Sequence, residues 1–127
     1  TSTNGGSSYD SGGSDYAWQN EQWATYTRLD ADAEILLTGN TSGTAYTVGS
    51  AADEPGLAGW IWLIGPHLTG YTAVSSCLNM KSASAYYIGN ECFAYRLEAA
   101  DVDAFQLYFS SGNIESGTIT AYGIANA

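Results

Sequence analysis

The chain has 127 residues, of which 45% are hydrophobic and 13% aromatic, so it can form one domain with a real core and is not intrinsically disordered along most of its length. Thirteen acidic and three basic residues give a formal net charge of -10, which opposes nucleic-acid binding because phosphates are contacted mainly by lysine and arginine. No apolar run is long enough to span a membrane and no secretory signal is visible, although a cleaved signal would leave no trace.

Residues 1–17 are rich in glycine and serine and predict an extended, flexible N-terminal arm, followed by a β-sandwich domain over residues 18–127. Such an arm is too poor in apolar groups to become ordered alone, so we expect it to lie on a neighbouring subunit or partner protein. Aromatic residues in and after the arm are candidate partner-binding anchors that fix it to a body, either its own or a neighbour's. These anchors are Tyr9, Tyr16, Trp18 and Trp23.

After the arm, short segments rich in β-branched and aromatic residues alternate with clusters of glycine, asparagine, aspartate, serine and proline. This pattern predicts an all-β sandwich or barrel. The region around 97–105 is compatible with one helical turn or with a polar connection between strands. The expected strands cover residues 23–29, 33–38, 45–48, 59–64, 72–78, 85–88, 92–97, 104–109 and 117–124.

The strand expected at 59–64 is apolar on both faces. Trp60, Trp62 and Ile64 alternate with Ile61 and Leu63, so neither face is polar. A strand of this kind is covered on both sides, by its own chain or by a subunit contact, and we favour its own chain because most apolar residues are core residues. Trp60 and Trp62 are nevertheless candidate partner-binding residues.

The two cysteines, Cys77 and Cys92, flank a predicted hairpin. If the hairpin is centred between residues 84 and 85, the two side chains lie opposite each other and can form a disulfide. Two buried free thiols are an equally good interpretation.

Reactive side chains are scarce. His67 lies in a turn bounded by glycine and proline, so we expect an exposed loop histidine and no catalytic residue, cofactor or metal site. Asp30, Asp32 and Glu34 fall on one face of an extended segment and raise the possibility of calcium binding or of a glycosidase carboxylate pair. The spacing lacks the glycine turn of a calcium loop, and we favour a solvated acidic face that protects a sheet edge.

The C-terminal sequence VDAFQLYFSSGNIESGTITAYGI, residues 102–124, resembles the C-terminal segment of small structural proteins from tailed bacteriophages. In both, an apolar alternating strand is followed by a Ser/Gly/Asn turn, an Ile, Ser-Gly-Thr, and a strand that ends in Tyr-Gly. Ala121 departs from this pattern, because a larger apolar residue is common there. The matching elements are Phe105, Leu107, Phe109, residues 111–113, Ile114, residues 116–118, Tyr122 and Gly123.

The resemblance implies a jelly-roll-like antiparallel β-sandwich and a non-enzymatic virion protein. It is expected to be a capsid decoration (cement) protein on the capsid surface, made in the host cytoplasm, which stabilises the head by bridging major capsid proteins as a homotrimer. The alternative is a tail-fibre or tail-tip receptor-binding domain whose exposed aromatic residues, such as Trp60, Trp62, Tyr86 and Tyr87, stack on a host carbohydrate. No nucleic-acid or membrane partner is expected under either interpretation.

Overall fold

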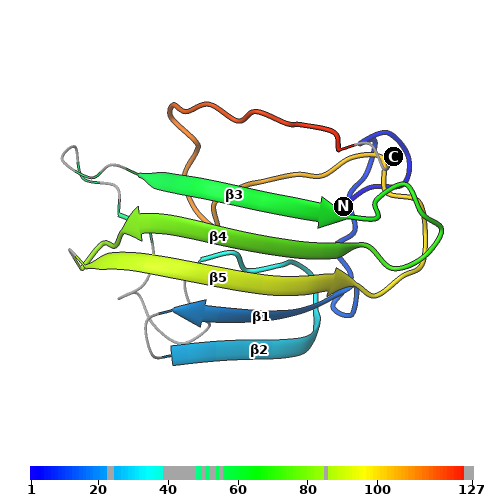
Figure 1. The fold of residues 1–127 in the computed structure, drawn as a ribbon, viewed down its shortest axis with the longest axis horizontal. Helices are drawn as coiled ribbons and strands as arrows, with labels where there is room; N and C mark the ends of the chain where they lie inside the picture. Colours follow the sequence, from blue (N-terminus) through cyan, green and yellow to red (C-terminus); the bar gives the residue numbers. More distant parts are fainter. Residues whose placement is uncertain are drawn as a thin grey trace.

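The computed structural model describes residues 1–22, 25–38, 48, 49, 51, 54, 56–84 and 86–124, and these residues form one antiparallel sheet with five strands (Figure 1). No helix forms in these ranges, which confirms the all-β class. The described residues therefore contain no helix that is long and apolar enough to cross a membrane. A jelly roll needs two sheets, and the described residues form only one. The strands are β1 (Tyr16–Gln22), β2 (Thr25–Asp32), β3 (Leu57–Ile64), β4 (Ala73–Lys81) and β5 (Tyr87–Arg96).

The strands lie in the order β2-β1-β5-β4-β3, so β2 and β3 are the two edges of the sheet. The chain leaves β2 at one edge and enters β3 at the other. Residues 33–38 begin this connection and cross behind the sheet (Figure 1). We expected a strand over 33–38, but these residues form no strand; their apolar side chains cover the sheet instead.

The core lies between the back of the sheet and this crossing segment. Trp18, Val74, Cys92 and Ala94 are its buried centre. Side chains on successive strand residues point to opposite faces, so β5 alternates regularly between exposed and buried positions along its whole length. Six partly buried residues pack against the centre: Leu29, Ile35, Leu36, Leu37, Ile61 and Leu63.

Two buried asparagines attach the crossing segment to the sheet. The Asn20 side-chain amide on β1 donates a 2.9 Å hydrogen bond to the carbonyl oxygen of Leu36. The amide of Asn90 on β5 donates in the same way to the carbonyl oxygen of Leu37. Both asparagines are only 1% exposed, and unpaired backbone carbonyls under a sheet would be costly. The two bonds therefore hold in place the layer that covers the core.

The hairpin of β4 and β5 has a register one residue away from the one that would bring the cysteines together. Cys77 lies opposite Glu91, and Cys92 lies opposite Ser76. A shift of one residue turns a side chain to the other face of a strand, so Cys92 is in the core, Cys77 lies on the front, and both thiols are free. The disulfide interpretation is wrong because the hairpin is centred on residue 84.

The strands expected at 59–64 and 72–78 are confirmed as β3 and β4, whereas those expected at 85–88 and 92–97 form one continuous strand, β5. β1 was not expected, because its residues were assigned to the arm and its root. Residues 104–109 and 117–124 form no strand, since among the described residues no strand pairs with them; Ala104 forms an isolated bridge with Ser2. Most of the expected strand at 45–48 lies outside the described residues.

Candidate functional site: an open sheet face

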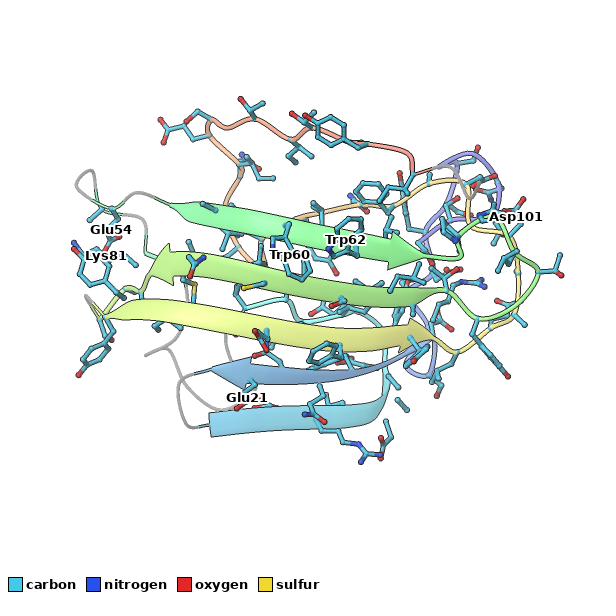
Figure 2. The ribbon with its side chains drawn as sticks, in the orientation of Figure 1. Glu21, Glu54, Trp60, Trp62, Lys81 and Asp101 are labelled. Atoms are coloured by element: carbon cyan, nitrogen blue, oxygen red, sulfur yellow. The ribbon has the colours of Figure 1, made fainter. Side chains whose placement is uncertain are left out.

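The front of the sheet carries large apolar side chains that the described chain leaves uncovered (Figure 2). We call this surface the open face. Its principal residues are Trp60, Trp62 and Ile64 on β3 and Phe93 and Tyr95 on β5, and each side chain is about half exposed, from 48% to 55%. The expectation that the chain itself covers both faces of β3 is therefore wrong. The crossing segment covers only the back, and the subunit-contact alternative stays open.

Strand register brings these residues together. Trp62 pairs with Ser75, which pairs with Phe93. Two residues away along the strands, Ile64 pairs with Ala73, which pairs with Tyr95. β4, which lies between β3 and β5, thus contributes small side chains between two rows of large ones. Contiguous exposed apolar surfaces of this kind are typical of binding sites rather than of free protein surfaces.

The two tryptophans do not form a flat platform. The ring centroids of Trp60 and Trp62 are 6.1 Å apart, and the ring planes are inclined at 63° in an edge-to-face arrangement. Consecutive sugar rings of an extended chain would need coplanar faces on which to stack. A protein surface, by contrast, can place apolar side chains around two inclined rings.

The acidic end of the open face is its second feature. Glu21 on β1 lies directly opposite Glu91 on β5, and the same row continues through Cys77 to Trp60. Figure 2 shows Glu21 on the front of the sheet, below the two tryptophans. Like charges directly opposite each other across two strands are unfavourable, so a positively charged group above them would be stabilising.

The N-terminal anchors are placed differently from our expectation. Tyr16 and Trp18 are each only 3% exposed, and the Trp18 indole N–H donates a 2.9 Å hydrogen bond to the carboxylate of Asp32. Both are residues of β1, and because their side chains are buried in this fold they are not available to a partner. Tyr9 is 37% exposed. Trp23 lies outside the described residues.

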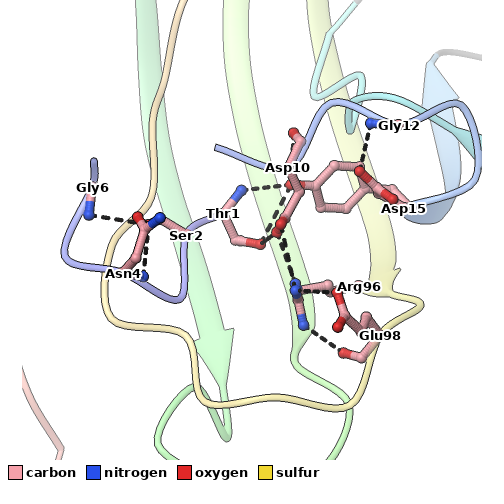
Figure 3. A network of polar contacts seen from close by, with 10 residues as sticks. Thr1, Ser2, Asn4, Gly6, Asp10, Gly12, Asp15, Arg96 and Glu98 are labelled. Atoms are coloured by element: carbon pink, nitrogen blue, oxygen red, sulfur yellow. Dashed lines mark hydrogen bonds and ion pairs between the residues drawn. The ribbon is translucent and has the colours of Figure 1, made fainter. Parts of the chain in front are cut away.

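The N-terminal segment does not extend away from the body (Figure 3). The backbone of Ser2 pairs with Ala104, and the Asp10 carboxylate accepts hydrogen bonds from the hydroxyl of Thr1 (2.7 Å) and the Nε of Arg96 (2.8 Å). The Arg96 side chain is 2% exposed and also binds Glu98 at 2.8 Å. The expectation of an arm ordered only by another molecule is therefore wrong, because a buried arginine holds the segment on its own body.

The three carboxylates of the acidic segment have separate partners. Asp30 pairs with Arg28 at 2.6 Å, Asp32 accepts the Trp18 N–H, and Glu34 accepts a hydrogen bond from the Tyr108 hydroxyl. This last bond raises the pKa of Tyr108 to about 12. Within the described ranges, no group of three or more metal-ligating side chains is arranged around a common centre.

Neither His67 nor the cysteines form a reactive site with neighbouring residues. His67 is exposed in its turn, as expected. Burial in the core raises the pKa of the Cys92 thiol to about 12, which disfavours the nucleophilic thiolate.

Sequence reasoning missed Phe93 and Tyr95 as surface residues. The signal was present, because glycine, glutamate, phenylalanine and tyrosine occupy every second position after Tyr87 and so share one face of β5. The alternation is not apparent when the stretch is interpreted as two separate strands, at 85–88 and 92–97, in place of one continuous strand. Comparison of the chain with protein-family models, with curated proteins and with solved structures finds no match.

Proposed function

We propose that this chain is a non-enzymatic virion protein that decorates a bacteriophage capsid and docks on the shell through its open face. The observation that carries this proposal is the uncovered apolar face formed by Trp60, Trp62, Ile64, Phe93 and Tyr95. Aromatic residues concentrate at the centres of protein interfaces, where their large rings bury much surface with little loss of side-chain freedom.

The partner is a protein surface with apolar side chains at its centre and lysine or arginine at one end. The apolar part covers the aromatic rows, and the basic part lies over Glu21 and Glu91. The resemblance of residues 102–124 to phage structural proteins makes the major capsid protein the preferred candidate. Bridging between capsid subunits would stabilise the head, because many contacts must break together before the shell expands.

The test is binding of the purified protein to particles of the parent virus from which it has been removed. Replacing both tryptophans, Trp60→Ser and Trp62→Ser, should weaken binding at least about tenfold, the loss typical of buried aromatic anchors. Tyr71→Ser is the matched control, since Tyr71 is 63% exposed but lies in the loop before β4. Equal binding by the double variant and the native chain would refute the proposed docking face.

A receptor-binding role at the tail is the second candidate. It is supported by a shallow hollow at one end of the sheet, where Gly56, Ala58, Asn79 and Gly89 lie next to the exposed ring of Tyr87. One sugar ring could stack there while the Asn79 amide binds a hydroxyl group. Selective binding on a glycan array, abolished by Tyr87→Ser, together with no binding to stripped particles, would establish this role in place of capsid decoration.

A further inference from the structure

The two edges of the sheet differ in how they are protected. The β2 edge carries Arg28, Asp30 and Asp32, and charged side chains on an edge strand discourage pairing with another chain. The β3 edge, Leu57–Ile64, has no charged residue and no proline, and both of its faces are apolar. The unpaired backbone groups of such an edge are a template for a further strand, so β3 is suited to pairing with an additional strand.

The same chain contains a segment with the properties of the missing strand. Residues 117–124, GTITAYGI, carry no charge and match β3 in length, since both span eight residues. Ile119, Tyr122 and Ile124 are 68%, 85% and 69% exposed, and the segment pairs with no other strand. A sequence rich in threonine, isoleucine and tyrosine favours an extended strand, but the chain alone gives it no partner.

We propose that residues 117–124 of one copy add to the sheet of a second copy as a strand along its β3 edge. Backbone hydrogen bonds would join the two, as in other cases where an extended segment completes a sheet. The donated segment would bury its exposed isoleucines beside apolar side chains of β3. Each copy has one donor segment and one acceptor edge, so no copy is left with an unfilled edge in a closed assembly.

The second copy is preferred because, among the described residues of its own chain, the segment pairs with no strand and keeps its apolar side chains exposed. In Figure 1 it runs beyond the β3 edge as a separate trace, in the same direction as the strand, and its apolar side chains remain exposed. The donor and the acceptor are different surfaces, so the contact is head-to-tail, which gives a ring of copies where the rotation closes and an open filament where it does not. The expected homotrimer is one such ring.

Charge also favours this contact between copies. Each copy carries a formal net charge of -10, so copies repel each other wherever acidic surfaces meet. The donor segment and β3 bring no charge to their contact. Two open faces would instead oppose their Glu21 and Glu91 pairs, which makes face-to-face dimerisation unfavourable.

The experiment combines sedimentation of the full-length chain with hydrogen exchange. We expect the native chain to associate at micromolar concentration. Every second amide of residues 118–124, those that face β3 of the second copy, should be protected there and should exchange freely on dilution. Proline removes a backbone donor. Neighbouring donors of a strand point to opposite sides, so at least one of Thr120→Pro and Ala121→Pro should weaken association about tenfold or more. Ser116→Pro, outside the segment, is the matched control.

Three results would overturn the proposal. The first is a native chain that stays monomeric at high concentration, and the second is unchanged association of both proline variants. The third is protection of residues 118–124 that does not depend on protein concentration, because this would mean pairing within one chain. This test needs no viral particle. A chain that assembles but does not bind particles would count against capsid docking and not against strand exchange. A monomer that binds particles would count against strand exchange and not against capsid docking.

Discussion

At the scale of single residues, Arg96 decides where the N-terminal segment lies. Its guanidinium is buried on β5 and forms hydrogen bonds with the carboxylate of Asp10 and with both the backbone and the side chain of Glu98. The hydrogen bond from Arg96 is the main reason that the pKa of Asp10 lies below its usual value. A buried ion pair contributes little when intact, but removing Asp10 would leave the buried guanidinium with Glu98, whose side chain is 72% exposed, as its remaining counter-charge.

We therefore predict that Asp10→Asn destabilises the protein by about 3 kcal/mol at neutral pH. The folded-state pKa of Asp10 is lowered, so its stabilisation is present above the unfolded pKa of about 3.9 and is lost as the pH falls through the folded value. The difference in stability between the native chain and the variant should begin to narrow below about pH 4 and should close only below the lowered folded-state pKa. Urea unfolding at several pH values measures this, with Asp101→Asn as the exposed control. A difference that persists at low pH would contradict the assigned role.

At the scale of elements, the register between β4 and β5 determines which side chains meet the solvent. A register shifted by one residue, with the hairpin centred between residues 84 and 85, would reverse the faces of one strand relative to the other. The observed register places Cys77 on the front and Cys92 in the core. The exposed positions of Phe93 and Tyr95 follow from the same register.

Thiol labelling tests this register. In the native chain, a soluble disulfide reagent should modify one cysteine quickly, and Cys77→Ser should abolish that fast reaction. The second thiol should react only as the protein unfolds, because burial raises the pKa of Cys92 to about 12. Fast labelling of Cys92 in folded protein would show that β5 faces the other way.

At the scale of the whole molecule, stability depends on a single sheet whose back is closed by a connecting segment. The chain segment at 33–38 lies under the sheet, and Asn20 and Asn90 bind two of its carbonyl oxygens. The front has no corresponding cover in the described part of the chain. Among the described residues, the back of the sheet is thus covered and the front is exposed.

We predict that Asn20→Ala lowers the free energy of unfolding by about 1–3 kcal/mol, because it leaves a buried carbonyl oxygen without a partner. Asn79→Ala is the matched control, since Asn79 is an exposed residue of β4. Chemical denaturation of the two variants and the native chain gives the comparison. If both substitutions have the same small effect, Asn20 does not hold the crossing segment.

Some features of this protein follow from local sequence. Alternating apolar and polar residues between turn-forming clusters indicated an all-β chain, and β3 and β4 were found close to their expected positions. His67 was recognised as an exposed turn residue from its glycine and proline neighbours. Such features depend on the conformational preferences of a few adjacent residues.

Tertiary structure alone decided which apolar residues are buried. Trp60 lies in a wholly apolar strand and Trp18 in a mostly polar one, yet Trp18 is in the core and Trp60 is half exposed. The difference arises because the crossing segment covers only one face of the sheet, and because Arg96 draws the N-terminal segment onto the body. Both are contacts between residues far apart in the chain, which local patterns do not encode. Composition and alternation thus determined that the chain forms strands, whereas the packing of distant segments determined which face of the sheet is left uncovered by the described residues.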